Sequence, residues 1–221
     1  MRNRYINWLV LSLAICLLIS PGLLAAEEKQ DLKLAADELV IDDSNGEVIA
    51  IGNVQFERGK IRLTADKLNG QEELTKIEAD GNVIIKQLKR RLSAQHLEFN
   101  NQTGKGTLTG EPKYEGQGVL LQGNRFDFNL ETGKLVVQAD VYLEDKDAAM
   151  KAEAKKLVYY QAKNEALLIG DVIAHRGERR MTAQKMRINL ATNQIKAEGR
   201  STLIVPNAGE KQGDSSGDSS N

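Results

Sequence analysis

The sequence predicts an all-β protein whose sheet is built from six consecutive copies of a unit of about 29 residues. The first observation is a small residue that recurs in the pattern apolar-x-small-x-x-apolar, at Ala36, Ala65, Ala94, Gly123, Ala154 and Ala183. A second small residue follows each of these after 16 positions, at Gly52, Gly81, Gly110, Ala139, Gly170 and Gly199. Because every copy keeps the same internal offset, we expect a solenoid-like array or a sheet made by repetition.

A strict alternation marks the second half of each unit. With the first small residue as position zero, positions plus 12, 14, 16, 18 and 20 are apolar, Gly or Pro in 29 of 30 cases, the exception being Ser201. The 24 positions between them hold nine charged residues. This pattern is typical of a strand with one buried and one solvated face. We therefore expect Ala79, Gly81 and Val83 to be buried, and Glu78 and Asp80 to face water.

The first half of each unit predicts a shorter strand with a bulge. Its apolar positions are minus 2, 0, plus 3 and plus 5, as in Leu92, Ala94, Leu97 and Phe99. One inserted residue between positions 0 and plus 3 would return both parts of the strand to the same face. In the second strand, the central glycine predicts a sharp bend.

A hairpin turn is expected between the two strands of each unit. Position plus 10 holds residues that tolerate positive φ in five copies and Thr75 in the remaining one. The five are Gly46, Gly104, Gly133, Asn164 and Asn193.

Residues 1–26 have the layout of a cleavable secretory signal peptide. Basic residues come first, the apolar stretch Trp8 to Ile19 follows, and Pro21 precedes small residues that suit a peptidase. The alternative is an uncleaved membrane anchor, because the 19 residues from Trp8 to Ala26 just suffice to span a bilayer. Cleavage would remove Cys16, the one cysteine of the chain, and with it any disulfide.

The rest of the chain is expected to form one elongated domain at residues 32–205 and a disordered tail at residues 206–221, which is rich in Gly, Ser, Asp and Asn. Without residues 1–26 the chain has 28 basic and 31 acidic residues, a net charge of −3. This balance argues against a nucleic-acid partner.

Residues that could carry catalysis are scattered through the unit. His96 and His175 occupy different positions of the repeat, and His96 with Glu98 would supply two ligands where a zinc site needs three or four. No phosphate loop or nucleophile motif is present. We expect neither an enzyme nor a metal or cofactor site. Short basic clusters at Lys89–Arg91 and Arg176–Arg180 serve either solubility or contact with anionic groups.

The interior is unusual because two rows of the repeat are held to small residues, whereas barrel cores are filled by large branched side chains. Small residues allow either close approach of two sheets or room for a guest, and the sequence leaves both open. A guest would have to be apolar, since no charge occupies the alternating inward positions.

The repeated motifs resemble the OstA-like repeat of the lipopolysaccharide-transport (LptA) family. They stand here as Ala36-Asp37-Glu38-Leu39, Thr132-Gly133, Gly52-Asn53-Val54, Gly81-Asn82-Val83 and Gly170-Asp171-Val172. The resemblance covers about 80% of the chain. It departs from the family in the third unit, with Gly110-Glu111-Pro112, and in the last, with Gly199-Arg200-Ser201.

The resemblance implies an open β-jellyroll of consecutive antiparallel strands with a hydrophobic groove for the acyl chains of lipopolysaccharide. It also implies a periplasmic bridge that stacks end to end with matching domains of inner-membrane and outer-membrane partners. On the inner face, the largest side chains are the expected lipid contacts: Leu39, Ile41, Phe56, Leu68, Ile85, Leu97, Phe99, Phe126 and Phe128.

Edge strands present unpaired backbone groups to a second chain. We therefore expect head-to-tail self-association through residues 36–56 at one end and 188–205 at the other. Three alternatives remain. They are a membrane-anchored LptC-like partner, an envelope scaffold filled by its own side chains, and a polysaccharide-cleaving β-solenoid, for which the acid–base residues are not clustered.

Overall fold

The structure is a computed structural model that describes residues 32–206, except residues 73, 117, 130, 191 and 193. The expected signal peptide and the expected tail, apart from Pro206, lie outside the described residues. The regular elements of the described part are β-strands and one short helix, η1 (Gln161–Lys163). Within these residues, no helix is long and apolar enough to cross a membrane.

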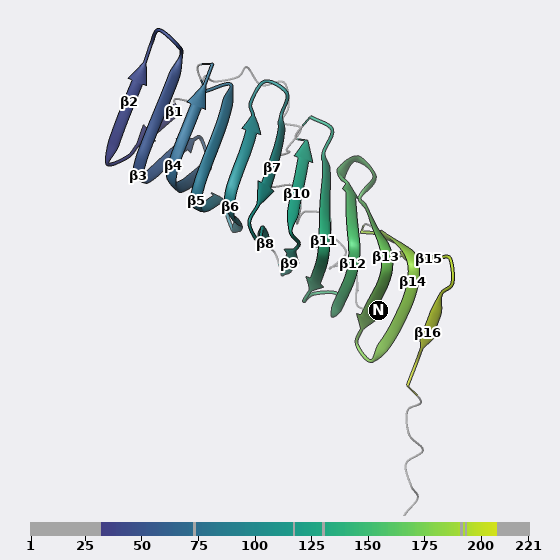
Figure 1. The fold of residues 1–221 in the computed structure, drawn as a ribbon. Coiled ribbons are helices and arrows are strands. Elements are labelled where there is room, and N and C mark those ends of the chain that lie inside the picture. Colours follow the sequence, from purple (N-terminus) through teal and green to yellow (C-terminus); the bar gives the residue numbers. More distant parts are fainter. Residues whose placement is uncertain are drawn as a thin grey trace, which may run out of the picture.

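Sixteen strands of the described part form one continuous antiparallel sheet, which Figure 1 shows as an elongated ladder from β2 to β16. The main path runs β1-β3-β4-β5-β6-β7-β10-β11-β12-β13-β14-β15, and β2, β8, β9 and β16 pair beside it. The expected all-β fold of antiparallel strands is confirmed. The strands are β1 (Leu32–Ala35), β2 (Glu38–Asp42), β3 (Glu47–Arg58), β4 (Ile61–Gln71), β5 (Lys76–Gln87), β6 (Arg90–Asn100), β7 (Lys105–Thr109), β8 (Lys113–Gly116), β9 (Val119–Gln122), β10 (Arg125–Asn129), β11 (Lys134–Asp145), β12 (Met150–Tyr160), β13 (Glu165–Arg176), β14 (Arg179–Asn189), β15 (Gln194–Glu198) and β16 (Thr202–Ile204).

The second strand of each unit bends where its central small residue lies. In β5, Gly81 has a φ of 72° and Asn82 a φ of 46°, and the pairing with β6 shifts between Asp80 and Val83. The predicted bulge is therefore present, but the extra residue belongs to the second strand and not to the first. The physical reason is that Gly and Asn adopt the positive φ that the bulge requires.

The third unit lacks a continuous second strand. There, β7 ends at Thr109 and β8 begins at Lys113, and both pair with β6. Pro112 lies in the interruption, where its missing N–H costs no ladder hydrogen bond.

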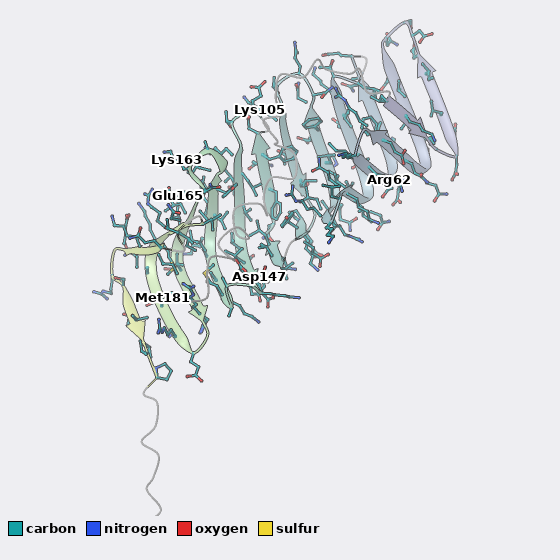
Figure 2. The ribbon with its side chains drawn as sticks, turned by 180° about the vertical axis from the view of Figure 1, so that it is seen from behind. Arg62, Lys105, Asp147, Lys163, Glu165 and Met181 are labelled. Atoms are coloured by element: carbon teal, nitrogen blue, oxygen red, sulfur yellow. The ribbon has the colours of Figure 1, made fainter. Side chains whose placement is uncertain are left out.

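The bends divide the sheet into two halves with a shared inner face. We call the turns within units (β2–β3, β4–β5, β6–β7, β10–β11, β12–β13 and β14–β15) the first rim, and the turns between units (β3–β4, β5–β6, β8–β9, β11–β12 and β13–β14) the second rim. Figure 2 shows Lys105, Lys163 and Glu165 along one rim and Arg62 and Asp147 along the other.

The predicted alternation of burial is confirmed in the interior of the sheet. Ala79 and Val83 are buried, Gly81 at the bend is partly buried, and Glu78 and Asp80 are exposed. The last unit differs, because Ala197 and the other inward positions of its second strand after Ile195 are exposed. Within the described part, β15 and β16 each pair only with β14, so nothing covers this end.

The predicted hairpin residues have positive φ in four copies, at Gly46, Gly104, Gly133 and Asn164. In the second copy, where Thr75 holds this position, Leu74 instead carries a positive φ of 65°. Asn193 lies outside the described residues.

Candidate functional site: an apolar cavity between the two halves of the sheet

A cavity of about 160 Å³ lies on the inner face in the first half of the chain. The half of the sheet that ends at the second rim contributes apolar walls from β1, β3, β4 and β5. The half that ends at the first rim contributes walls from β4, β5, β6 and β10. The lining residues are Leu32, Phe56, Arg58, Ile61, Leu63, Leu68, Leu74, Ile77, Ile85, Leu97, Phe99, Asn101 and Phe128. An apolar cavity of about 150 Å³ stays dry and can take up a small apolar molecule.

Two aromatic rings form one wall of the cavity. Phe99 of β6 and Phe128 of β10 stack with their centroids 5.9 Å apart and their planes at 23°. Gly106 of β7 lies directly opposite both residues in the ladder. A Cβ atom at this position would overlap the ring of Phe128, so the glycine makes room for the stack.

Most of the predicted lipid contacts line this cavity. Those at the wall are Phe56, Leu68, Ile85, Leu97, Phe99 and Phe128. Phe126 instead is 1% exposed and belongs to the packed core of the sheet. An aromatic residue at an inward position can line a cavity or pack in the core, and the sequence pattern does not distinguish the two.

Leu39 and Ile41 lie on the inner face but are not enclosed by it. They are directly opposite Ala50 and Val48 of β3, yet they are 39% and 61% exposed. Within the described part, β2 pairs only with β3, so this end of the sheet has no further strand to cover them.

Several lining residues were missed by sequence reasoning. Leu63 and Ile77 occupy inward positions of the alternation and could have been found from it. Leu74 and Asn101 come from turns of the first rim, where no periodicity places a side chain. Asn101 also accepts a hydrogen bond of 3.4 Å at Oδ1 from Nη1 of Arg58, which joins the two rims across the mouth of the cavity.

The bend explains one of the two rows of small residues. The backbone has a positive φ at Gly52, Gly81, Gly110, Gly170 and Gly199. Glycine adopts this conformation without steric strain, which explains why the repeat keeps a small residue in this row. The preceding first strand also lies against the glycine, since a Cβ atom at Gly81 would be 2.9 Å from Cβ of Asp66. These glycines therefore need no guest to account for them.

His96 lies on the outer face between two carboxylates. Its Nδ1 is 2.6 Å from Oδ1 of Asp80 and its Nε2 is 3.4 Å from Oε1 of Glu98. The hydrogen bond with Asp80 is the main cause of a raised pKa of His96, burial opposes it, and Glu98 adds to it. Among the described residues, no group of three or more His, Cys, Asp and Glu is placed to hold a metal ion.

Comparison with known proteins was made for the sequence and for the fold. The chain matches the family model "LptA/(LptD N-terminal domain) LPS transport protein" over residues 33–194 and again over residues 151–219. The first match alone covers more than half of the chain, so the protein belongs to this family of lipopolysaccharide-transport proteins. The resemblance of the repeats is thus confirmed, and the protein is a transport protein and not an enzyme.

Among solved structures, the chain is similar to LptH, described as the LptA-homologous periplasmic component of the lipopolysaccharide transport device of Pseudomonas aeruginosa. The identity is 13%, the TM-score is 0.26, and the match covers 82% of this chain and 99% of LptH. The comparison with curated proteins found no match.

Proposed function

We propose that the protein binds the acyl chains of lipopolysaccharide on the inner face of its sheet and carries them across the periplasm towards the outer membrane. We also propose that the fold is an open β-jellyroll in which six repeats form the two halves. Membership of the lipopolysaccharide-transport family supports the choice of ligand. The expected signal peptide at residues 1–26 supports the periplasmic location.

The observation that carries this proposal is the apolar cavity between the two halves. Eleven of its 13 lining residues are apolar, and the two polar ones, Arg58 and Asn101, are part of its mouth. Burying apolar surface is favourable by about 25 cal/mol per Å², so an acyl chain gains by leaving water for these walls. A scaffold with a self-filled core would not need this space.

The exposed ends of the sheet favour a second role in assembly. Large apolar side chains are exposed on the first strands, at Leu39, Val40, Ile41 and Ile51. Others are exposed on and just after the last strand, at Leu203, Ile204 and Val205. Unpaired strand edges with apolar side chains add further strands readily. The protein would thus stack head to tail with itself and with matching domains of inner-membrane and outer-membrane partners, extending the inner face into a bridge.

The direct test is mass spectrometry of lipid that co-purifies with the protein from a Gram-negative envelope. Lipopolysaccharide bound in stoichiometric amount is expected. A scaffold would be recovered empty, and this result would refute the proposal. Sequencing of the mature N-terminus separates the bridge from its LptC-like alternative, because an anchored protein would keep residues 1–26.

A further inference from the structure

The second rim beside the cavity carries a concentration of positive charge that lipid-chain binding does not explain. Residues 58–62 and 86–91 form the turns β3–β4 and β5–β6 with the adjoining strand ends, and they contain no acidic residue. Their basic residues are Arg58, Lys60, Arg62, Lys86, Lys89, Arg90 and Arg91. The whole chain, by contrast, has a net charge of −1.

Like charges face one another directly on the outer side of this rim. Arg62 of β4 is opposite Lys86 of β5, and Lys86 is opposite Arg91 of β6. Directly opposed like charges destabilise a sheet. Arg62 is compensated by Glu57, with Nε and Oε1 2.6 Å apart. Arg91 lies opposite Glu115 of β8, and its charge adds to the hydrogen bond from Lys113 in lowering the pKa of that carboxyl group. Lys86 forms no ion pair with a described residue. Lys86 therefore lies between two positive side chains at a cost in stability, which an external anion would offset.

Arg58 connects this charge with the cavity. It lines the cavity at the end of β3, and its one side-chain hydrogen bond within the described part is the 3.4 Å contact with Asn101 across the mouth. A guanidinium group has five N–H donors, so most of them have no partner among the described residues. Apolar walls and a cationic group thus meet at one opening, and no carboxylate is among the lining residues.

Lys60 and Lys89 extend the positive charge along the second rim beside Arg58. They are exposed at the tips of the turns β3–β4 and β5–β6, and the strands that follow and precede them pair at Ile61 and Gln87. Neighbouring strands lie about 4.8 Å apart, which places the two tips next to each other along the rim. We call Arg58, Lys60 and Lys89 the cationic mouth.

We propose that the cationic mouth binds the phosphate group of a lipid whose acyl chain enters the cavity. This inference rests on the proposed function and adds to it the chemistry and the position of the headgroup. Arginine binds phosphate oxygens through two parallel N–H bonds, and lysine acts on them as a point charge. The lipid is thereby held in one orientation, with its phosphate at the cavity mouth and its chain among the apolar walls.

The test compares two amphiphiles that share a tail and differ in headgroup. Dodecyl phosphate and dodecyl maltoside, both below their micellar concentrations, are titrated against the mature protein loaded with the neutral apolar dye N-phenyl-1-naphthylamine. We expect the wild type to bind the phosphate about tenfold more tightly or better, as charge-assisted hydrogen bonds imply. The triple variant R58Q/K60Q/K89Q should lose this preference and bind dodecyl maltoside as the wild type does.

A matched control removes the same charge elsewhere on the same rim. Arg176, Arg179 and Arg180 of β13 and β14 form no ion pair with a described residue and are exposed. None of them lines the cavity. The variant R176Q/R179Q/R180Q should keep the preference for dodecyl phosphate. If it loses the preference as fully as the mouth variant, net charge and not the mouth is responsible, and the proposal is overturned.

The remaining outcomes separate this inference from the proposed function. Displacement of the dye by both amphiphiles with equal affinity would overturn the cationic mouth and leave the lipid cavity standing. Failure of both amphiphiles to displace the dye would refute the lipid cavity itself. Competition by inorganic phosphate as effective as that by dodecyl phosphate would reveal a simple anion site. Co-sedimentation with vesicles of anionic phospholipid through the same three residues, without binding of single amphiphiles, would assign the charge to a membrane surface instead.

Discussion

Asn82 donates a hydrogen bond of 2.9 Å from Nδ2 to Oδ2 of Asp66, across the bend of the sheet and 16 residues along the chain. The same pair of positions is joined in the first unit, where Asn53 donates to Asp37 at 2.8 Å. This contact explains why the Ala-Asp and Gly-Asn motifs occur together. The aspartate of the first strand lies against the glycine of the second and accepts from the asparagine that follows it.

The fourth and fifth units keep this contact with other residue types. Asn124 donates to Asp140 at 3.1 Å, so that the amide and the carboxylate have exchanged places. In the fifth unit, Lys155 Nζ lies 2.6 Å from Asp171 Oδ2. What the bend requires is therefore a complementary pair and not a particular residue at either position.

Exchange of Asp66 and Asn82 with each other should be tolerated, whereas the single substitution N82D should destabilise the protein. N82D places two carboxylates at the bend and is expected to lower the free energy of unfolding by about 0.5–1 kcal/mol. The double variant D66N/N82D reproduces the arrangement of the fourth unit and should recover the loss, as measured by urea unfolding. A double variant no more stable than N82D would show that the pair does not couple the two strands.

Gly81→Ala should destabilise the protein by about 1–3 kcal/mol, because a side chain is placed at a φ of 72° and against Asp66. Gly177→Ala is the control. Gly177 has a φ of 56°, but a Cβ atom there would meet nothing within 4 Å. It should cost about 1 kcal/mol, the backbone strain alone. Equal losses in urea unfolding would mean that contact with Asp66 contributes nothing.

Phe99→Glu should leave the fold intact and abolish lipopolysaccharide binding. Phe99 is half-buried at the open wall of the cavity, so the carboxylate can remain hydrated while it excludes acyl chains. Phe126→Glu is the contrast, since Phe126 is buried in the core and its replacement should prevent folding. Circular dichroism reports the fold and a lipopolysaccharide pull-down reports binding. A folded F99E protein that binds lipopolysaccharide with wild-type affinity would show that Phe99 does not line a lipid groove.

Lysine at either end of the sheet should prevent self-association. Ile41 and Leu203 are exposed on the terminal strands β2 and β16, where a charge opposes the addition of another strand. I41K and L203K are each expected to remain monomeric in light scattering at concentrations where the wild type assembles. L88K serves as control, because Leu88 is exposed in the β5–β6 turn and not on a terminal strand. A wild type that stays monomeric at high concentration would contradict head-to-tail assembly.

His96 should make stability depend on pH. Its pKa is raised in the folded state by Asp80, so its contribution is fully present below the unfolded pKa and is lost as pH rises through the folded value. H96Q should therefore cost more stability near pH 5.5 than near pH 8.5, on either side of the ordinary value of about 6.5. An H96Q variant that loses equal stability at both pH values would show that the loss comes from packing and not from the charge.

The repeat made the local structure predictable from sequence. Alternation along residues 77–85 places one face of the strand in the core whatever the rest of the fold is, because successive side chains point to opposite faces. Gly46 and Gly81 likewise predict a turn and a bend, since positive φ is a property of the residue and its immediate neighbours. Three details differ from these predictions. The positive φ of the second turn lies at Leu74, the bulge lies on the second strand of the unit, and the inward positions after Ile195 are exposed.

The enclosure of each inward residue was decided by the tertiary structure. Phe126, Phe128 and Ile41 follow the same alternation, yet one is packed in the core, one lines the cavity and one is exposed at an end. The burial of each side chain depends on which half of the sheet lies opposite and on how many strands flank it. The alternation of residues along the strand determines neither. The position of Arg58 at the cavity mouth has the same origin, because the two rims meet only when the whole sheet has bent.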